Sequence, residues 1–163
     1  MTVIIHDLEN TELQTIFPQI GKDTVLVSEK GSIKNCIGCF GCWIKTPGTC
    51  VLKDGYENMG WILSQAETVI IISKCYYGGY SPFVKNILDR SIPFLLPFFK
   101  IEKNETHHKQ RYKNTFQLVV HFYGENITSQ EMDIAHSLVK ANAINLHATS
   151  CKVLFYQSFN QIA

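Results

Sequence analysis

The sequence lacks the long apolar run that a membrane-spanning helix needs. Its longest hydrophobic runs, Val69–Ile72 and Ile92–Phe99, are far shorter than the roughly 20 residues that cross a bilayer. The N-terminus, MTVIIHDLEN, has neither the basic segment nor the long apolar segment of a secretory signal peptide. We therefore expect a cytoplasmic protein with no membrane partner.

An excess of charge of one sign is also missing. Lysine and arginine together number 15 and the acids 14, so the net charge is +1, too small to attract nucleic acid or an anionic membrane in bulk. The sequence has no Walker loop, no HExxH pair and no Ser-His-Asp order, so hydrolase and NTPase functions lack support. It has no internal repeat. At 163 residues and 45% hydrophobic content, residues 1–163 fit a single packed domain.

Cysteines are concentrated in one short segment. Without a secretion signal, the six cysteines indicate thiols or metal ligands and not a disulfide framework. Four of them fall within fifteen residues, the first three spaced CxxCxxC: Cys36, Cys39, Cys42 and Cys50. They could ligate a [4Fe–4S] cluster or zinc, or act as uncoordinated redox-active thiols. Cys75 and Cys151 fit half-buried small hydrophobic positions.

Apolar runs rich in β-branched residues alternate with helical patterns. The predicted strands are Thr2–His6, Thr24–Ser28, Thr68–Ser73, Thr115–Phe122 and Cys151–Tyr156. Capping pairs predict two helix starts, at Asp54 with Glu57 and at Thr128 with Glu131, and Ser81 before Pro82 predicts a third. The helix after Ser81 is expected to carry Phe83 to Leu95, with Pro93 ending or kinking it. Residues 100–114 form a polar excursion.

Alternation of strands and helices predicts an α/β fold with a five-stranded parallel sheet and right-handed crossovers. The expected architecture is a flavodoxin-like three-layer sandwich with strand order 2-1-3-4-5. Its ligand crevice would lie at the carboxyl ends of strands one and three. The last helix is truncated to residues 157–163, which leaves one face near strand five uncovered as a candidate dimer surface.

Several motifs together resemble the NADPH-dependent FMN reductase-like flavoproteins, which include the iron–sulfur flavoproteins. These motifs are CIGCFGC, GTCVLKDG, AETVIIIS and YYGGYSPFVKNILDR. The resemblance implies bound FMN and an oxidoreductase activity. Electrons would pass from NAD(P)H, or from a [4Fe–4S] centre on the four cysteines, through the flavin to a small-molecule acceptor. It also implies a homodimer or homotetramer.

The resemblance also assigns candidate flavin-binding residues. The loop after the third strand would contact the flavin through Lys74, Cys75, Tyr76, Tyr77, Gly78 and Gly79. Small residues there let backbone N–H groups approach a flat ring, and a tyrosine can cover a ring face. Tyr123, Gly124 and Asn126, after the fourth strand, match a further flavin loop, and Asn10 could donate a hydrogen bond near the phosphate. No side chain is assigned a catalytic role.

One loop departs from the family pattern. After the first strand, where the family has a Ser/Gly/Arg-rich phosphate loop, the chain reads His6-Asp7-Leu8-Glu9-Asn10-Thr11, without glycine and with two acids. A phosphate dianion would meet like charge there. The alternative function is therefore a flavodoxin-like binding or assembly subunit that has lost cofactor binding.

Overall fold

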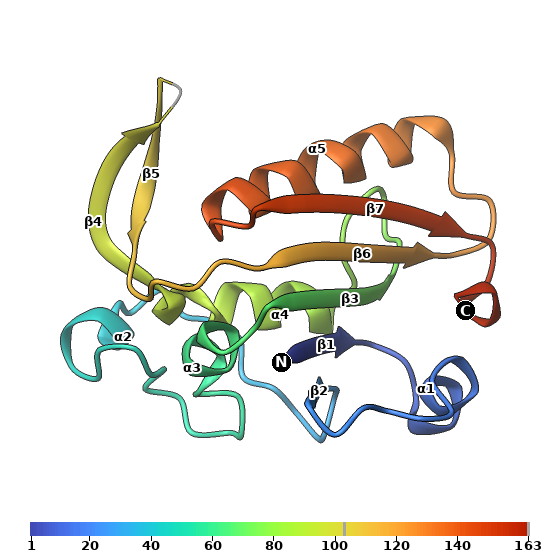
Figure 1. Ribbon diagram of the computed structural model, residues 1–163, viewed down its shortest axis with the longest axis horizontal. Helices are drawn as coiled ribbons and strands as arrows, with labels where there is room; N and C mark the ends of the chain where they lie inside the picture. The colour runs from blue at the N-terminus through green and yellow to red at the C-terminus, as the bar shows by residue number, and fades with distance from the viewer. Residues whose placement is uncertain (103, 163) are drawn as a thin grey trace.

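The computed structural model describes residues 1–102 and 104–162 (Figure 1). Its strands are β1 (Thr2–His6), β2 (Thr24–Val27), β3 (Thr68–Lys74), β4 (Leu95–Glu102), β5 (Glu105–Gln110), β6 (Gln117–Tyr123) and β7 (Ser150–Tyr156). Its helices are α1 (Asn10–Ile16), α2 (Gly41–Ile44), α3 (Met59–Ser64), α4 (Pro82–Arg90) and α5 (Ser129–Asn145). Two 3₁₀ turns, η1 (Ile92–Phe94) and η2 (Phe159–Gln161), complete the described elements.

The main sheet has five parallel strands in the order β2-β1-β3-β6-β7. Counted along this sheet alone, the order is 2-1-3-4-5, so the predicted flavodoxin-like architecture is confirmed. β3 lies at the centre, and its Val69, Ile71 and Ile72 are at most 2% exposed. A strand covered on both faces needs a nearly continuous apolar run, which the sequence TVIIIS supplies.

Two separate cores cover the two faces of the sheet. Val3 and Ile5 of β1 point into the larger core, which α3, α4 and α5 close with residues such as Leu63 and Ile87. Ile4, one residue out of phase, points into a smaller core that α1 and the C-terminal residues close. The sheet is therefore the middle layer of three.

Local capping chemistry explains where two helices begin. Ser81 precedes Pro82, the first residue of α4, and the Ser81 hydroxyl accepts a hydrogen bond from the Val84 N–H group. Thr128 and Glu131 form the predicted capping box at the start of α5. The predicted cap at Asp54 is wrong, because α3 begins five residues later, at Met59.

The segment after α4 differs most from its prediction. α4 ends at Arg90, and the apolar residues beyond η1 form strand β4, which pairs antiparallel with β5 in a two-stranded hairpin. This hairpin replaces both the expected helix end near Leu95 and the expected polar excursion. Figure 1 shows it projecting away from the main sheet. Phe98, Phe99 and Ile101 are between 60% and 72% exposed on it.

The described C-terminal residues contain no full last helix. After β7 the chain forms only the short turn η2, which packs against α1. β7 is an edge strand, and none of its residues is fully buried. The expected dimer surface at this edge stays a prediction. Among residues 1–102 and 104–162, no helix is both long enough and apolar enough to span a membrane.

Candidate functional site: a crevice beside a cysteine pocket

A crevice opens at the carboxyl ends of β1 and β3, where strand order reverses in the sheet. Its volume is about 400 Å³, and ligand pockets in proteins measure about 300 to 1,000 Å³. The lining comes from the last residues of β3 and β6, from the segments after β1, β2 and β3, and from α4. These residues are Asp7, Glu29, Ile33, Asn35, Lys74, Tyr76, Ser81, Pro82, Phe83, Asn86 and Tyr123. The crevice is thus open to a ligand at the place the topology predicts.

Asp7 is held firmly at one end of this crevice. Its Oδ2 accepts a hydrogen bond from the Lys74 backbone N–H group at 2.8 Å. Its Oδ1 accepts one from the Tyr123 hydroxyl at 3.0 Å. Burial raises the pKa of Tyr123, and the neighbouring Asp7 carboxylate raises it further. Tyr123 therefore stays a hydrogen-bond donor, and the Asp7 carboxylate remains fixed across the ends of three strands.

The turn between β1 and α1 does not fit the phosphate of FMN. Glu9 caps α1, and the Glu9 side chain accepts the N–H group of Glu12 while Glu12 Oε2 accepts the Glu9 N–H group at 2.8 Å. The capping box thus places two carboxylates at the helix start, and Glu12 takes the Glu9 N–H group that could otherwise face a phosphate. The ring-sized crevice suits a flavin, and the turn beside it does not suit a phosphate group.

The predicted flavin loop is a tight turn. Tyr76 and Gly79 exchange both backbone hydrogen bonds, at 3.0 and 2.8 Å, and Tyr77 and Gly78 between them have φ of 52° and 80°. Two positive φ values define a type I′ turn, in which glycine relieves strain. A Cβ on Gly78 would also lie 2.7 Å from the Glu131 carbonyl oxygen. The turn thus packs against α5, and its Tyr76 and Gly79 N–H groups are used internally.

The candidate flavin residues separate into two groups. Lys74, Tyr76 and Tyr123 line the crevice. The others do not: Cys75 gives its N–H group to the Tyr123 carbonyl, Tyr77 is 87% exposed, and Gly78 and Gly79 form the turn. The Gly124 and Asn126 N–H groups bond to Tyr156 and Gln157, and Asn10 is an exposed residue at the start of α1. Burial raises the pKa of the Cys75 thiol.

Several crevice residues are not among the candidates from sequence. They include Glu29, Ile33, Asn35, Phe83 and Asn86. Glu29 follows β2 closely, and in a parallel sheet the residues after each strand meet at one edge. That rule could have found Glu29 and Asp7. Asn35 lies farther along the loop, and its position depends on contacts with α4.

All four clustered cysteines line a second, small pocket whose surface is almost entirely apolar. Their neighbours there include Ile37, Phe40, Leu52, Ile92 and Pro93. Cys36 and Cys39 are exposed, and Cys42 and Cys50 are buried. Burial raises the pKa of the Cys42 thiol, and the nearby Cys50 raises it further.

The cysteine pocket has the donor set of an iron–sulfur centre without its geometry. Four thiols are the ligands that a [4Fe–4S] cluster takes. Within residues 1–102 and 104–162, however, no three His, Cys, Asp or Glu side chains are arranged as metal ligands. The structure thus gathers the cysteines at one pocket and leaves the metal assignment a prediction.

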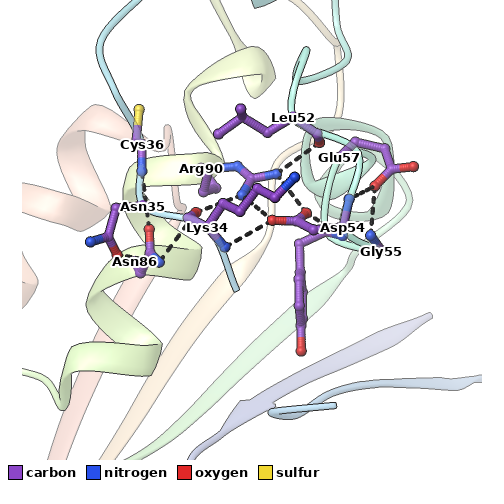
Figure 2. Close-up of polar contacts among 10 residues, drawn as sticks. Lys34, Asn35, Cys36, Leu52, Asp54, Gly55, Glu57, Asn86 and Arg90 are labelled. Carbon is purple, nitrogen blue, oxygen red and sulfur yellow. Dashed lines mark hydrogen bonds and ion pairs between the residues drawn. The ribbon is translucent and has the colours of Figure 1, made fainter. Parts of the chain in front are cut away.

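Arg90 lines the cysteine pocket and forms a buried ion pair with Asp54 behind it (Figure 2). Arg90 and Asp54 bond through both oxygens, at 2.8 and 2.9 Å, with side chains 0% and 6% exposed. The guanidinium also donates to the Lys34 and Leu52 carbonyl oxygens. Arg90 holds the pKa of Asp54 well below its usual range. The Arg90 Nε atom is buried without a hydrogen-bond partner among the described residues.

Only one turn of α4 separates the two pockets. Asn86 lines the crevice and Arg90, four residues on, lines the cysteine pocket. The Asn86 side chain accepts the Cys36 N–H group at 3.3 Å and donates to Asn35 Oδ1 at 3.0 Å (Figure 2). Asn35 and Cys36 are thus neighbours in the chain that face different pockets. The two pockets are therefore connected through this turn of α4 and through the Asn35–Cys36 peptide.

Comparison with known proteins finds iron–sulfur flavoproteins among the curated relatives. No family model matches the chain. An iron-sulfur flavoprotein from Archaeoglobus fulgidus is 28% identical over 90 residues, covering 55% of this chain and 36% of that protein. One from Methanocaldococcus jannaschii is 35% identical over 63 residues, covering 39% of this chain and 32% of that protein. The matches thus span about a third of these curated relatives.

Solved structures resemble the chain over nearly its whole length. An FMN-dependent NADH-azoreductase from Bacillus anthracis in complex with FMN has a TM-score of 0.54 at 10% identity, covering 99% of this chain and 88% of that one. The general stress protein 14 from Treponema denticola, in complex with FMN, has a TM-score of 0.59 at 9% identity, covering 95% and 84%. An NAD(P)H:quinone oxidoreductase from Methanothermobacter marburgensis has a TM-score of 0.56 at 11% identity, covering 99% and 92%.

At these identities the structural matches establish the fold alone. The sequence matches confirm the resemblance drawn from the cysteine and loop motifs. The chain therefore has a flavodoxin-like fold, and part of its sequence is similar to iron–sulfur flavoproteins.

Proposed function

We propose that the chain is a flavin-dependent oxidoreductase that holds the flavin ring in the crevice between β1 and β3. The observation that carries the proposal is the open cavity of about 400 Å³ at the switch point of a flavodoxin-like sheet. The relatives named as flavoproteins, and the FMN complexes among the structural neighbours, support it. A bound flavin supplies electron and hydride transfer, for which the proposed donor is NAD(P)H and the proposed acceptor a small molecule.

The residues of the crevice suit a flat, polar-edged ring. Tyr76 and Phe83 offer aromatic surface, and the Asn35 and Asn86 amides offer hydrogen-bond donors and acceptors for ring edges. Lys74 adds one positive charge, and its Nζ atom lies 5.8 Å from the centre of the Tyr76 ring. These groups bind and orient the ring, and none needs to act as an acid or base.

A matched pair of tyrosine variants tests this proposal. Purified protein is titrated with riboflavin and with FMN, and binding is followed by quenching of flavin fluorescence. Tyr76→Ala is expected to weaken flavin binding about tenfold, because a ring-sized aromatic contact is lost. Tyr77→Ala, the exposed neighbour outside the crevice, is expected to leave binding unchanged. Binding of neither flavin by the parent protein would contradict the proposal.

The four clustered cysteines are the proposed redox centre beside the crevice. Their shared pocket and its position one helical turn away support this role. Anaerobic purification followed by iron and zinc analysis is the test, with Cys42→Ser as the variant and Cys151→Ser as the control. A redox centre predicts iron in the parent and in Cys151→Ser, and its loss in Cys42→Ser. Thiols that hold no metal but are oxidised by the substrate would also agree with a redox centre. Zinc would contradict it, since zinc has no redox chemistry.

A second candidate is a binding or assembly subunit without a cofactor. The carboxylates of Asp7, Glu9 and Glu12 at the phosphate turn favour it, because such a turn is what loss of FMN binding would leave. The same flavin titration separates the two candidates, since this subunit binds neither flavin. The predicted homodimer or homotetramer is tested by sedimentation velocity.

A further inference from the structure

The charged groups at the β1–α1 turn point to the chemical class of the cofactor. In doubly wound sheets a phosphate binds at this turn, where backbone N–H groups and positive charge favour it. Here the charged side chains of the turn and the first helical residues are all acids: Asp7, Glu9 and Glu12. The Glu9 and Glu12 side chains form the capping box at the helix start, and Glu12 Oε2 accepts the Glu9 N–H group at 2.8 Å. A phosphate at this helix end would meet both carboxylates at close range.

Asp7 cannot easily turn away from an incoming anion. Both of its oxygens are engaged, by the Lys74 N–H group at 2.8 Å and the Tyr123 hydroxyl at 3.0 Å. The Asp7 side chain is half-buried and lines the crevice. Rotating it outward would lose both hydrogen bonds and leave the half-buried Tyr123 hydroxyl without this acceptor.

The whole lining of the crevice carries more negative than positive charge. Its charged residues are Asp7, Glu29 and Lys74, two acids and one base. A phosphate dianion would be repelled by this set at close range. Hydroxyl groups would instead donate hydrogen bonds to the carboxylates. A flavin whose ribityl chain ends in a hydroxyl meets these requirements, whereas one that ends in a phosphate does not.

We propose that this crevice selects a flavin without a phosphate, of the riboflavin class, over FMN. The proposal rests on the proposed flavin binding and refines it. The first test compares dissociation constants for riboflavin and FMN on the purified full chain in low salt. Riboflavin is expected to bind at least about tenfold more tightly, a difference that a like-charge contact at the protein surface can supply.

Two further measurements assign the cause. Asp7→Asn keeps an acceptor for Tyr123 and removes the charge, so FMN affinity is expected to rise about fivefold while riboflavin affinity changes less than about twofold. Asp133→Asn makes the same change in net charge on the exposed side of α5, and it should leave the ratio unchanged. The salt test uses the parent protein, so it stands even if Asp7→Asn fails to fold. Raising the salt concentration from about 20 mM to about 500 mM should bring the dissociation constants for FMN and riboflavin closer together.

The possible outcomes separate this proposal from the proposed function. Equal affinities, or tighter binding of FMN, would overturn the selection and leave a flavin-dependent oxidoreductase. A riboflavin preference that salt does not alter would contradict repulsion between the carboxylates of the crevice and the FMN phosphate as its cause. Binding of neither flavin would overturn both proposals.

Discussion

The crevice and the cysteine pocket lie on either side of one helical turn, yet their physical character is opposite. The crevice measures about 400 Å³, is open, and is lined by two acids and one lysine. The cysteine pocket measures about 40 Å³ and is apolar, with the Arg90 guanidinium buried in its wall. The acids of the crevice therefore disfavour a bound anion, whereas the cysteine pocket disfavours charge through burial, as the raised pKa of Cys42 shows.

The difference follows from how each charge is compensated. In the crevice Asp7 has two neutral donors and no salt-bridge partner among the described residues. At the cysteine pocket Asp54 pairs with Arg90 through two charge-assisted bonds. Two acids in one small domain thus serve opposite purposes. One excludes anions from a ligand site, and the other keeps a buried cation in place.

Removal of the buried cation should have the largest effect. Arg90→Met would leave Asp54 buried without its partner, and the free energy of unfolding is expected to fall by about 3–5 kcal/mol. Urea unfolding followed by circular dichroism measures the change. On the same helix, Lys85→Met removes an exposed pair with Asp89 and should cost less than about 1 kcal/mol.

The double variant Arg90→Met with Asp54→Leu sharpens this prediction. It removes the unpaired carboxylate, so it should recover part of the stability that Arg90→Met loses. A double variant no more stable than Arg90→Met would show that packing, and not charge, holds this wall. The comparison between the two pockets would then lose its electrostatic basis.

Thiol labelling tests the enclosure of the cysteine pocket. In metal-free native protein, iodoacetamide is expected to modify the exposed Cys36, Cys39 and Cys151 at least about tenfold faster than the buried Cys42 and Cys50. The raised pKa of Cys42 slows that thiol further, since the thiolate is the reactive form. Mass spectrometry of peptides gives the rates. Equal labelling of all five would mean that the pocket is as open as the crevice.

The buried His6, next to Asp7 in the chain, should make stability depend on pH. Burial lowers the pKa of His6, and neither ring nitrogen has a hydrogen-bond partner among the described residues. As pH falls below about 6.5, the unfolded chain gains a proton that the folded chain does not, so stability falls. His6→Leu should raise stability at pH 7 by about 1 kcal/mol and flatten this decline.

The decline will not vanish, because burial also lowers the pKa values of His121 and His147. If His6→Leu left the dependence of stability on pH unchanged, His6 would not be a cause of the decline. His6 precedes Asp7 but lies outside the crevice lining, so flavin affinity should change by less than twofold.

The smallest effect is expected from the Tyr123 hydroxyl in the crevice. Tyr123→Phe removes one of the two donors to Asp7, and the lost hydrogen bond should cost about 1 kcal/mol of stability. Tyr77→Phe removes an exposed hydroxyl and should cost nothing measurable. Thermal unfolding compares the two. If Tyr123→Phe lowered the free energy of unfolding by more than about 3 kcal/mol, the hydrogen bonds of Asp7 would contribute as much as the Arg90–Asp54 pair. The two pockets would then not differ in this respect.

Features encoded in short stretches of sequence could be predicted. The apolar run TVIIIS indicates a strand buried on both faces wherever it occurs in the chain, and β3 is that strand. Thr128 and Glu131 lie three residues apart and cap α5 without help from elsewhere. Handedness and short connections then reduce the possible orders of five alternating strands to a few, and the observed order is one of them.

Features that depend on residues far apart in the chain could not be predicted from the sequence. Asp54 and Glu57 have the spacing of a capping box, but Arg90, 36 residues away, binds the Asp54 carboxylate, and α3 starts later. The apolar residues of β4 resemble a helix end until β5 pairs with them. Asn35 reaches the crevice because Asn86, 51 residues away, holds it. Among the missed crevice residues, Asn35 belongs to this long-range kind, whereas Glu29 directly follows a predicted strand.

The single turn of α4 between Asn86 and Arg90 limits how this protein can change during evolution. A substitution at either position alters a partition that both chambers share, so a gain in one is coupled to a disturbance in the other. Residues that line one chamber away from this turn of α4, such as Glu29 on the crevice side and Cys50 on the cysteine side, are free of that coupling. Divergent relatives should therefore vary at such outer positions and preserve the partition.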